Sequence, residues 1–319
     1  MSPKRKPKID LVIPVFDEVG VIEQFHQQLS AALDGLAFTF RIYYVDDGST
    51  DGTADALRVI ADSDPRVSPL ILSRNFGHQS ALTAGLDAAQ GDFVISLDGD
   101  GQHPPEMIPQ MIALFEQGYD IVQAQRVDDS SASAFKRFTS SGFYTLINSI
   151  SGTQIAPGAA DFRGMSRQAV DALEGMPEFH RFLRGMVSYI GFKTVILPYH
   201  EVHRMAGRSK YSLGKMFRLA MDAIFSFSLL PLYIGMSTGV IFFCLAALEM
   251  LYVTSLWIKG DTSNLAPGWS SLMFVILIIG AVLMILLGFI GIYVGYIFQE
   301  VKRRPQYLIK RENQSDLNG

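Results

Sequence analysis

Short hydrophobic runs alternate with helical patterns through the first part of the chain. The runs that are apolar on both faces predict strands at Ile9–Val15, Phe40–Val45, Val67–Leu72, Phe93–Leu97 and Asp120–Ala124. The patterns between them predict helices at Val19–Leu33, Thr53–Ala61, Gln79–Ala89 and Pro105–Gln117. This alternation is typical of an α/β domain with a mostly parallel sheet covered by helices. Such sheets bind ligands at the carboxyl ends of their strands, so the residues just after each strand are the informative ones.

Two much longer apolar stretches follow. Leu232–Ile258 has Glu249 as its only charged residue, and Ser271–Phe298 has none. Each exceeds the roughly 20 residues that a helix needs to cross a bilayer, so we predict two transmembrane helices. Lysines and arginines gather before the first stretch and after the second, and basic flanks stay in the cytosol. The pattern therefore predicts an integral inner- or plasma-membrane protein whose two ends are cytosolic.

The segment Ser209–Phe227 is amphipathic. Apolar residues recur on one helical face, at Leu213, Met216, Phe217, Ala220, Ile224 and Phe227. Such a helix suits the membrane interface among lipid phosphates, although packing on the soluble domain is the alternative. The predicted organisation is a cytosolic domain (residues 1–202), juxtamembrane amphipathic helices (203–230), a two-helix transmembrane domain (231–298) and a basic cytosolic tail (299–319).

Charge and cysteine content narrow the function classes. The formal net charge of −4 argues against a nucleic-acid binder. Cys244 is the single cysteine of the 319 residues, which excludes an internal disulfide framework and fits a reducing compartment.

Acidic residues gather where the predicted strands end. They are Asp17 and Glu18 after the first strand, Asp46, Asp47 and Asp51 after the second, and Asp98 and Asp100 after the fourth. A turn with a helix N-cap would explain part of "DDGSTDGT", and solvated turn carboxylates would be the plain interpretation of "DGD". Hard divalent cations, however, take carboxylate oxygens and complete their shell with substrate phosphates. We therefore interpret the strand-end Asp-x-Asp as a clamp for a metal-bound diphosphate.

An ordered set of motifs resembles a known family. "VIPVFDE", "VDDGSTDGT", "SRNFGHQSALTAGLDAAQGD", "DGDGQHPPE", "DFRGMSR" and "RMAGRSKYS" together look like the polyprenyl-phosphate glycosyltransferases, which are inverting enzymes with the GT-A (Rossmann-like) fold, akin to dolichyl-phosphate mannose synthase. With the two apolar stretches and the closing "KRRPQYLIKR", the resemblance is strongest to the bacterial bactoprenol glucosyltransferases of O-antigen modification. It covers the chain from Ile9 to Arg311.

The resemblance implies a donor site around the first two strand ends. Pro14, Phe16 and Glu18 would hold the nucleotide base, with Asp46 or Asp47 beside it. Phe16 stands where the mannose synthases often have tyrosine, so the ring face is kept and the hydroxyl is lost.

The resemblance also implies a metal site and two phosphate sites. Asp98, Asp100 and Gln102 would bind Mg²⁺ or Mn²⁺, and Gly99, which replaces the usual alanine or valine, is expected to loosen the loop without removing a ligand. Arg204 and Lys210 would reach the nucleotide diphosphate, and Arg126, Arg137 and Ser141 would hold the acceptor phosphate.

The implied reaction moves a hexose, with glucose from UDP-glucose as the first candidate, to undecaprenyl or another polyprenyl phosphate, with inversion, on the cytosolic face. A metal and basic side chains on the leaving diphosphate would supply most of the stabilisation. The acceptor phosphate has a second pKa near 6, so it is largely dianionic at neutral pH and needs no strong base. Asp161 is the candidate if a base or an acceptor-positioning residue exists, and a structural pair with Arg163 is the alternative.

Several alternatives stay open at this point. The donor could instead be GDP-mannose or UDP-formamido-arabinose, because nothing in the residues fixes the sugar or the base. A processive polysaccharide synthase is disfavoured by the small number of predicted spans. A non-catalytic membrane subunit that helps to move lipid-linked sugar would tolerate the loss of Asp98 and Asp100. The family suggests a homo-oligomer in contact with membrane lipids.

Overall fold

A computed structural model describes residues 6–127, 159–178, 181–200, 230–259 and 268–310 of the chain. The chain divides into two compact units, one of Met1–Tyr211 with Pro305–Gly319 and one of Ser212–Arg304. The predicted amphipathic helix lies outside the described residues, and so does the loop between the two long helices.

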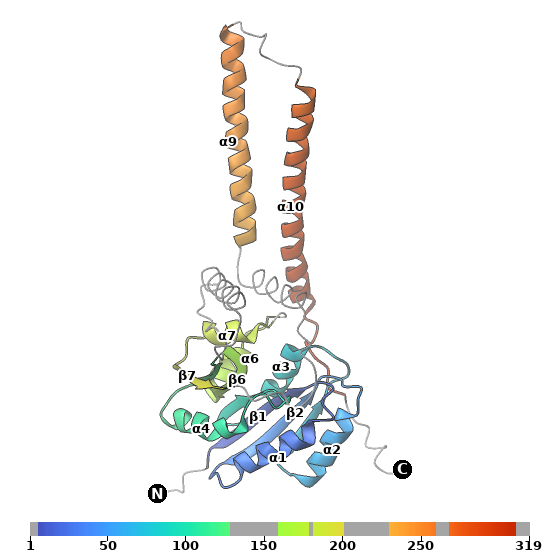
Figure 1. Ribbon diagram of the computed structural model, residues 1–319, viewed down its shortest axis with the longest axis vertical. Helices are drawn as coiled ribbons and strands as arrows, with labels where there is room; N and C mark the ends of the chain where they lie inside the picture. Colours follow the sequence, from blue (N-terminus) through green and yellow to red (C-terminus); the bar gives the residue numbers. More distant parts are fainter. Residues whose placement is uncertain (1–5, 128–158, 179–180, 201–229, 260–267, 311–319) are drawn as a thin grey trace. The chain divides into compact units, whose positions relative to one another are not determined.

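The first unit is built on a sheet of seven described strands in the order β3-β2-β1-β4-β6-β5-β7 (Figure 1). Their bounds are β1 (Lys8–Val15), β2 (Thr39–Asp46), β3 (Val67–Ile71), β4 (Phe93–Ser96), β5 (Ile121–Arg126), β6 (Ala159–Ser166) and β7 (Thr194–Tyr199). Neighbouring strands are parallel except that β6 runs antiparallel to both β4 and β5. The predicted mostly parallel sheet is confirmed, and β1 to β5 match the predicted strands to within two residues.

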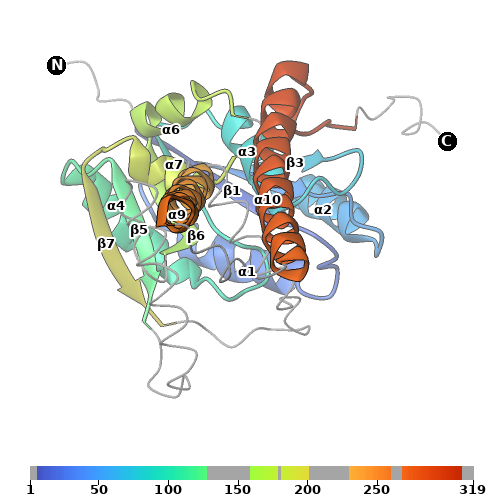
Figure 2. The same cartoon turned by 90° about the horizontal axis from the view of Figure 1, so that it is seen from above.

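Helices cover both faces of this sheet. They are α1 (Ile22–Leu33), α2 (Thr53–Ser63), α3 (His78–Ala88), the 3-10 turn η1 (Pro105–Met107), α4 (Ile108–Glu116), α6 (Arg167–Glu174) and α7 (Leu183–Tyr189). α1 packs against α2, η1 and α4, and these elements share one buried core with β1, β2 and β4. α3 packs on β1, β2 and α6, so it covers the opposite face. The strands β3 and β7 form the two edges of the sheet (Figure 2).

Helix α1 begins later than its hydrophobic pattern predicts. The backbone amides of Val21 and Ile22 both donate to the Glu18 carbonyl oxygen at 3.0 Å, so a turn occupies the residues before the helix. The predicted start at Val19 was therefore wrong by three residues, and Ile22 is the first helical position.

Strands β6 and β7 and helices α6 and α7 were not predicted. β6 contains Asp161 and Arg163, which are buried as a pair, so the strand lacks the continuous apolar run that marks β1. β7 is an edge strand whose burial alternates and which contains Pro198. Neither strand therefore carries the signal of a buried parallel strand.

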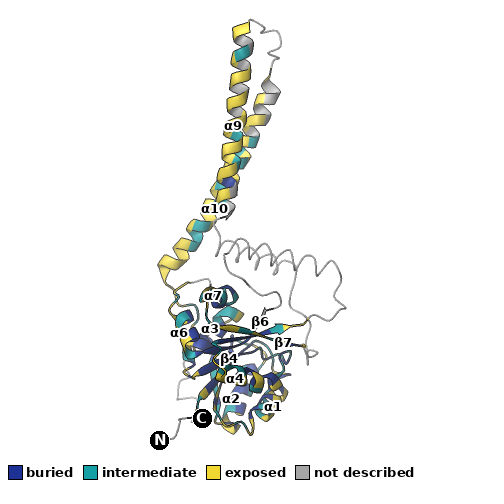
Figure 3. Cartoon of the chain, turned by 90° about the vertical axis from the view of Figure 1, so that its left-hand side faces the viewer, coloured by how far each residue is buried: buried dark blue, intermediate teal, exposed yellow. Residues whose placement is uncertain are grey.

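The second unit contains two long helices, α9 (Leu230–Lys259) and α10 (Trp269–Lys302). They contact each other, and Gly235 approaches Leu286 so closely that an added methyl group would collide with it. Most of their described side chains are exposed, including many large apolar ones (Figure 3). In the described part of the chain one segment, Ile278–Lys302, is long and apolar enough to cross a membrane, with a mean hydropathy of 2.5. The apolar segment found in α9, Gly235–Leu245, is shorter, so a span by α9 stays a prediction.

Candidate functional site

The carboxyl ends of β1 and β4 meet at the point where the strand order reverses. The chain runs outward from β1 to β3 and then returns through α3 to β4, which lies on the other side of β1. Val12 of β1 pairs with Ser96 of β4, so the residues that follow both strands lie at one edge of the sheet. Open α/β sheets bind ligands at such a point. The acidic residues after β1, β2 and β4 are thereby brought to the same edge, as predicted.

The loops after β1 and β2 are interlocked by hydrogen bonds. The Asp17 amide donates to the Ser49 hydroxyl (2.9 Å), and the Thr50 amide donates back to Asp17 Oδ1 (2.9 Å). The Glu18 amide donates to Thr53 Oγ1 (2.9 Å). Asp17 has a φ of 52°, a left-handed conformation that aspartate tolerates better than most residues. The two acidic motifs therefore form one rigid rim.

Asp46 and Asp47 are almost fully buried within this rim. The Asp46 carboxylate accepts from the Ser49 hydroxyl and amide. Asp47 accepts from the amides of Phe76 (2.7 Å) and Gly77 (2.9 Å), in the connection between β3 and α3. Burial raises the pKa of both carboxyl groups despite these donors. Both side chains hold loops together, and a place for one of them beside a nucleotide base stays a prediction.

Asp98 follows β4 and presents an incompletely bonded carboxylate. Its amide donates to Nδ1 of His103 (2.9 Å), a buried side chain that stacks on Phe162 with ring centroids 5.1 Å apart. The Gln102 amide donates to Asp100 Oδ1 (3.1 Å). Oδ1 of Asp98 is buried and has no hydrogen-bond donor among the described residues. A buried carboxylate oxygen is costly unless positive charge lies near it, and His78 Nε2, 3.6 Å away, supplies part of that charge without donating a hydrogen bond.

The donor set at this turn fits a hard divalent cation. Asp98, Asp100 and Gln102 offer carboxylate and amide oxygens, the ligand types that Mg²⁺ and Mn²⁺ prefer. Within the described ranges, no group of three or more His, Cys, Asp and Glu residues has the arrangement of a complete metal site. Water and substrate phosphates commonly complete the coordination shell of such a cation.

Gly99, between the two aspartates, is explained by close packing. A methyl group at this position would lie 2.5 Å from Val15 Cγ1 and 3.3 Å from Ile13 Cγ2. The turn after β4 therefore lies directly on β1. Gly99 was expected to loosen the loop; instead, its lack of a side chain lets the two strand ends lie close together.

Behind the turn lies a cluster of charged side chains around Asp161, which is 4% exposed. Its carboxylate bonds Arg163 (3.0 Å) and Arg184 of α7 (3.0 Å). Nε2 of His78, the first residue of α3, lies 3.3 Å from Asp161 Oδ2 and 3.6 Å from Asp98 Oδ1. His78 thus links the turn after β4 to the buried cluster.

The charges of this cluster fix its protonation. Burial opposes the charge on His78, but the hydrogen bond to Asp161 and the charge of Asp98 outweigh it and raise the pKa of the imidazole to about 9. Burial likewise opposes the charge on Asp161, but Arg184, His78 and Arg163 hold the pKa of its carboxyl group well below the usual range. A carboxylate held ionised in this way is a poor proton acceptor. The pairing of Asp161 with Arg163 is confirmed, and a role in acceptor positioning stays a prediction.

The other predicted site residues fall into two groups. Pro14 is buried at the end of β1, Phe16 and Glu18 are partly exposed beyond it, and Arg126 is exposed at the end of β5, whose carboxyl end lies at the same edge. The remaining four lie outside the described residues: Arg137, Ser141, Arg204 and Lys210.

Two charged residues of the site were missed by the sequence analysis. His78 stands just after the connection that follows β3, at the ligand edge of the sheet, so its position beyond a strand end was an available signal. Arg184 lies in a short helix that no pattern predicted, and nothing local distinguishes it from a surface arginine.

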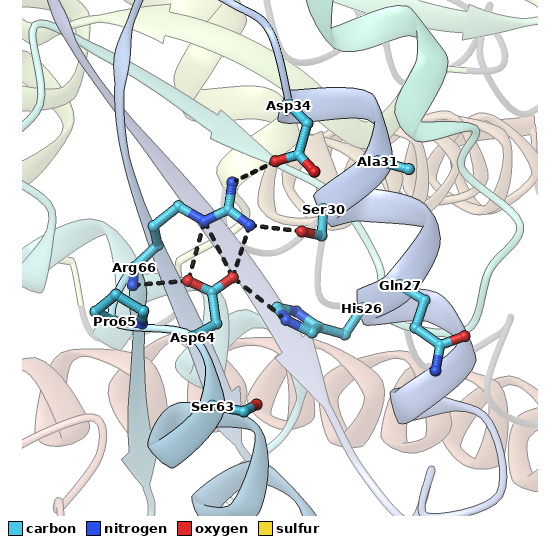
Figure 4. A pocket seen from close by; sticks show the side chains of 9 residues that line it. All are labelled: His26, Gln27, Ser30, Ala31, Asp34, Ser63, Asp64, Pro65 and Arg66. Carbon is cyan, nitrogen blue, oxygen red and sulfur yellow. Dashed lines mark hydrogen bonds and ion pairs between the residues drawn. The ribbon is translucent and has the colours of Figure 1, made fainter.

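A second polar cluster lies away from this site, in a surface hollow of about 500 Å³ (Figure 4). Arg66 binds Asp64 through two guanidinium nitrogens and also reaches Ser30 (2.5 Å) and Asp34 (3.2 Å) of the α1 region. His26 Nε2 lies 3.4 Å from Asp64. Arg66 immediately precedes β3, so the hollow belongs to the amino-terminal edge of the sheet, and we assign it a structural role.

Known proteins are similar to this chain over most of its length. The model of the family described as "Glycosyl transferase family 2" matches residues 10–174. The "Prophage bactoprenol glucosyl transferase homolog" of Escherichia coli (strain K12) is 39% identical over 307 residues, which cover 95% of this chain and 99% of that protein. The "Bactoprenol glucosyl transferase" of Shigella phage SfV is 39% identical over 310 residues, with 96% and 99% covered. The "Uncharacterized glycosyltransferase YkcC" of Bacillus subtilis (strain 168) is 37% identical over 307 residues, with 96% and 94% covered.

Proposed function

Because the chain belongs to glycosyl transferase family 2, we propose that it transfers glucose from UDP-glucose to undecaprenyl phosphate or a related polyprenyl phosphate. The observation that carries this proposal is the similarity, over nearly the whole chain, to proteins named bactoprenol glucosyl transferase. The geometry supports it, because the buried Asp98 oxygen without a donor stands at the ligand edge of the sheet.

The proposed donor site joins the rim and the turn after β4. Asp98, Asp100 and Gln102 would hold Mg²⁺ or Mn²⁺, which when bound neutralises charge on the donor diphosphate. Arg204 and Lys210 would add positive charge to the same leaving group. The base would lie against Pro14, Phe16 and Glu18 of the rim, near Asp46 or Asp47.

The proposed transfer needs no proton to be removed at neutral pH. An oxygen of the dianionic acceptor phosphate, held by Arg126, Arg137 and Ser141, forms a bond to the anomeric carbon. The bond from that carbon to the β-phosphate oxygen breaks on the opposite face, so the configuration inverts and UDP leaves. The ionised state of Asp161 agrees with this scheme, because no general base is called for.

The proposed setting is the cytosolic face of a membrane. α9 and α10 would both span it with the two chain ends in the cytosol, and the segment Ser209–Phe227 would lie at the interface among lipid phosphates. The protein would act as a homo-oligomer that supplies lipid-linked glucose for cell-surface glycan modification.

A donor screen on the full-length protein in detergent tests the proposal. Undecaprenyl phosphate, Mg²⁺ or Mn²⁺ and radiolabelled UDP-glucose should give a lipid-extractable glucosyl phosphate, and EDTA should abolish it. Parallel reactions with GDP-mannose and UDP-formamido-arabinose test the alternative donors, and a polymeric product would indicate a processive synthase. If no donor gives a lipid-linked sugar, the proposal is overturned and a non-catalytic membrane subunit becomes the better hypothesis.

A further inference from the structure

The chain after α10 returns to the sheet of the first unit. Residues 305–310, here called the C-terminal segment, lie along the β3 edge. The Ser73 amide donates to the Leu308 carbonyl oxygen (2.8 Å), and the Lys310 amide donates to the Ile71 carbonyl oxygen (2.7 Å). Leu72 and Ile309 form an antiparallel bridge between these two bonds. The segment therefore extends the sheet beyond its edge strand.

Side chains of the same segment reach two further elements. The Tyr307 hydroxyl donates to Asp87 Oδ2 (2.9 Å), in the last turn of α3. Burial and the charge of Asp87 raise the pKa of this phenol, so it stays protonated as a donor. Gln306 Nε2 donates to the Glu178 carbonyl oxygen (2.5 Å), in the chain that leads toward α7.

The contacts of the C-terminal segment at Ser73 and Asp87 flank, in sequence, a stretch that reaches the site. Ser73 lies just beyond β3, and Asp87 lies near the end of α3. Between them are the amides of Phe76 and Gly77, which bind Asp47, and His78, which contacts Asp98 and Asp161. The C-terminal segment therefore holds both ends of an element whose middle touches the rim and the turn after β4.

We propose that the C-terminal segment is a positioning element of the donor site. It fixes the connection between β3 and α3 through backbone pairing and fixes α3 through Tyr307. These contacts set the positions of His78 and of the amides that bind Asp47. Its catalytic consequence rests on the function proposed above, whereas the positioning itself does not.

A purely protective role is the competing explanation. A short strand that covers β3 would shield an exposed edge from pairing with other chains. In that case its loss would free the Ser73 amide and change stability or solubility, but it would not change the order of residues 76–78. Positioning instead predicts a local loosening of residues 76–78 and a donor-specific kinetic defect, because Asp47 and Asp98 lie on the proposed donor side.

Neighbouring proline substitutions separate the two explanations. Lys310→Pro removes the amide that donates to Ile71, whereas Ile309→Pro is the matched control, because in an antiparallel bridge the Ile309 amide faces away from β3. Tyr307→Phe removes only the hydroxyl that binds Asp87. All three are made in the full-length chain in detergent.

Hydrogen exchange of residues 76–78, without substrate, is the first measurement, and the Michaelis constants for UDP-glucose and undecaprenyl phosphate are the second. In Lys310→Pro, the loss of one hydrogen bond should speed exchange in this stretch about fivefold and raise the Michaelis constant for UDP-glucose about fivefold. Tyr307→Phe should produce similar changes. Ile309→Pro should change the exchange rate and the Michaelis constant for UDP-glucose by less than about twofold. The Michaelis constant for undecaprenyl phosphate should stay the same in all three variants.

Unchanged exchange in residues 76–78 would overturn the proposal, as would an equal rise in both Michaelis constants. If Lys310→Pro does not fold, Tyr307→Phe decides the outcome alone. If the wild-type protein is inactive with every donor, the proposed function fails, and the exchange measurement still decides the positioning.

Discussion

Replacing Asp98 is expected to change both stability and activity. His78 Nε2 lies 3.6 Å from Asp98 Oδ1, and the charge of Asp98 helps to raise the pKa of His78, so Asp98→Asn should lower the thermal midpoint slightly at pH 7. The same substitution should lower glucosyl transfer by about 10²–10³-fold, because the proposed metal site at the diphosphate would lose a ligand.

Transfer assays and thermal unfolding in detergent measure both effects. Asp62→Asn, on the exposed side of α2, is the matched control and should change neither. Full activity in Asp98→Asn would falsify the metal-clamp assignment.

Gly99 makes a second prediction at a single position. The 2.5 Å approach to Val15 Cγ1 means that Gly99→Ala should destabilise the sheet unit by about 1–3 kcal/mol. Val15→Ala removes the colliding methyl group, so the double variant should be more stable than the sum of the two single changes indicates. Thermal unfolding of the four proteins measures this coupling, and additive effects would mean that the turn moves away instead.

Among the secondary-structure elements, the connection from α2 to β3 is tied to α1 by the Asp64–Arg66 pair (Figure 4). The hydrogen bonds from Arg66 hold the pKa of Asp64 below its ordinary value. The stabilisation from this pair is therefore complete above the unfolded-state pKa, about 3.9, and is lost as the pH falls through the lower folded-state value.

Asp64→Asn should lower the thermal midpoint at pH 7 and should reduce its fall between pH 5 and pH 3. Wild-type and variant proteins, each scanned across this range in detergent, measure the difference. Asp55→Asn is the matched control, because Asp55 forms an exposed pair with Arg58 on α2. Parallel pH profiles for Asp64→Asn and the wild type would show that the pair contributes no pH-dependent stability.

The elements that could be predicted are those with local signals. β1 to β5 are short, mostly apolar runs, and α1, α2 and α4 each bury one apolar face, whereas α3 is mostly apolar and buried over the whole run 81–86, so pattern and outcome agree. β6 could not be found in this way, because its Asp161 and Arg163 compensate each other only after folding brings Arg184 and His78 to them. The acidic strand ends were predictable for the same local reason, whereas their cationic partners come from distant positions.

Over the whole chain, the division into a sheet unit and a helical unit follows hydropathy closely. The stretches Leu232–Ile258 and Ser271–Phe298 lie within α9 and α10. What hydropathy did not predict is that residues 305–310 belong to the sheet unit, because their attachment is mainly through backbone atoms and has no side-chain pattern.

The number of spans is the remaining whole-chain prediction. Cys244 is first replaced by serine, which leaves a chain without cysteine. In this background, Ser263→Cys, between α9 and α10, should react with an impermeant maleimide in right-side-out vesicles, because neutral short loops cross the membrane more readily than basic flanks. Asn313→Cys, which follows the basic residues after α10, should react only after the vesicles are permeabilised. Equal labelling of both cysteines in intact vesicles would place the two positions on one side, and α10 would then not span. Protection of the cysteine at position 263 in intact vesicles would leave it on the same side as the sheet unit, and α9 would then not span.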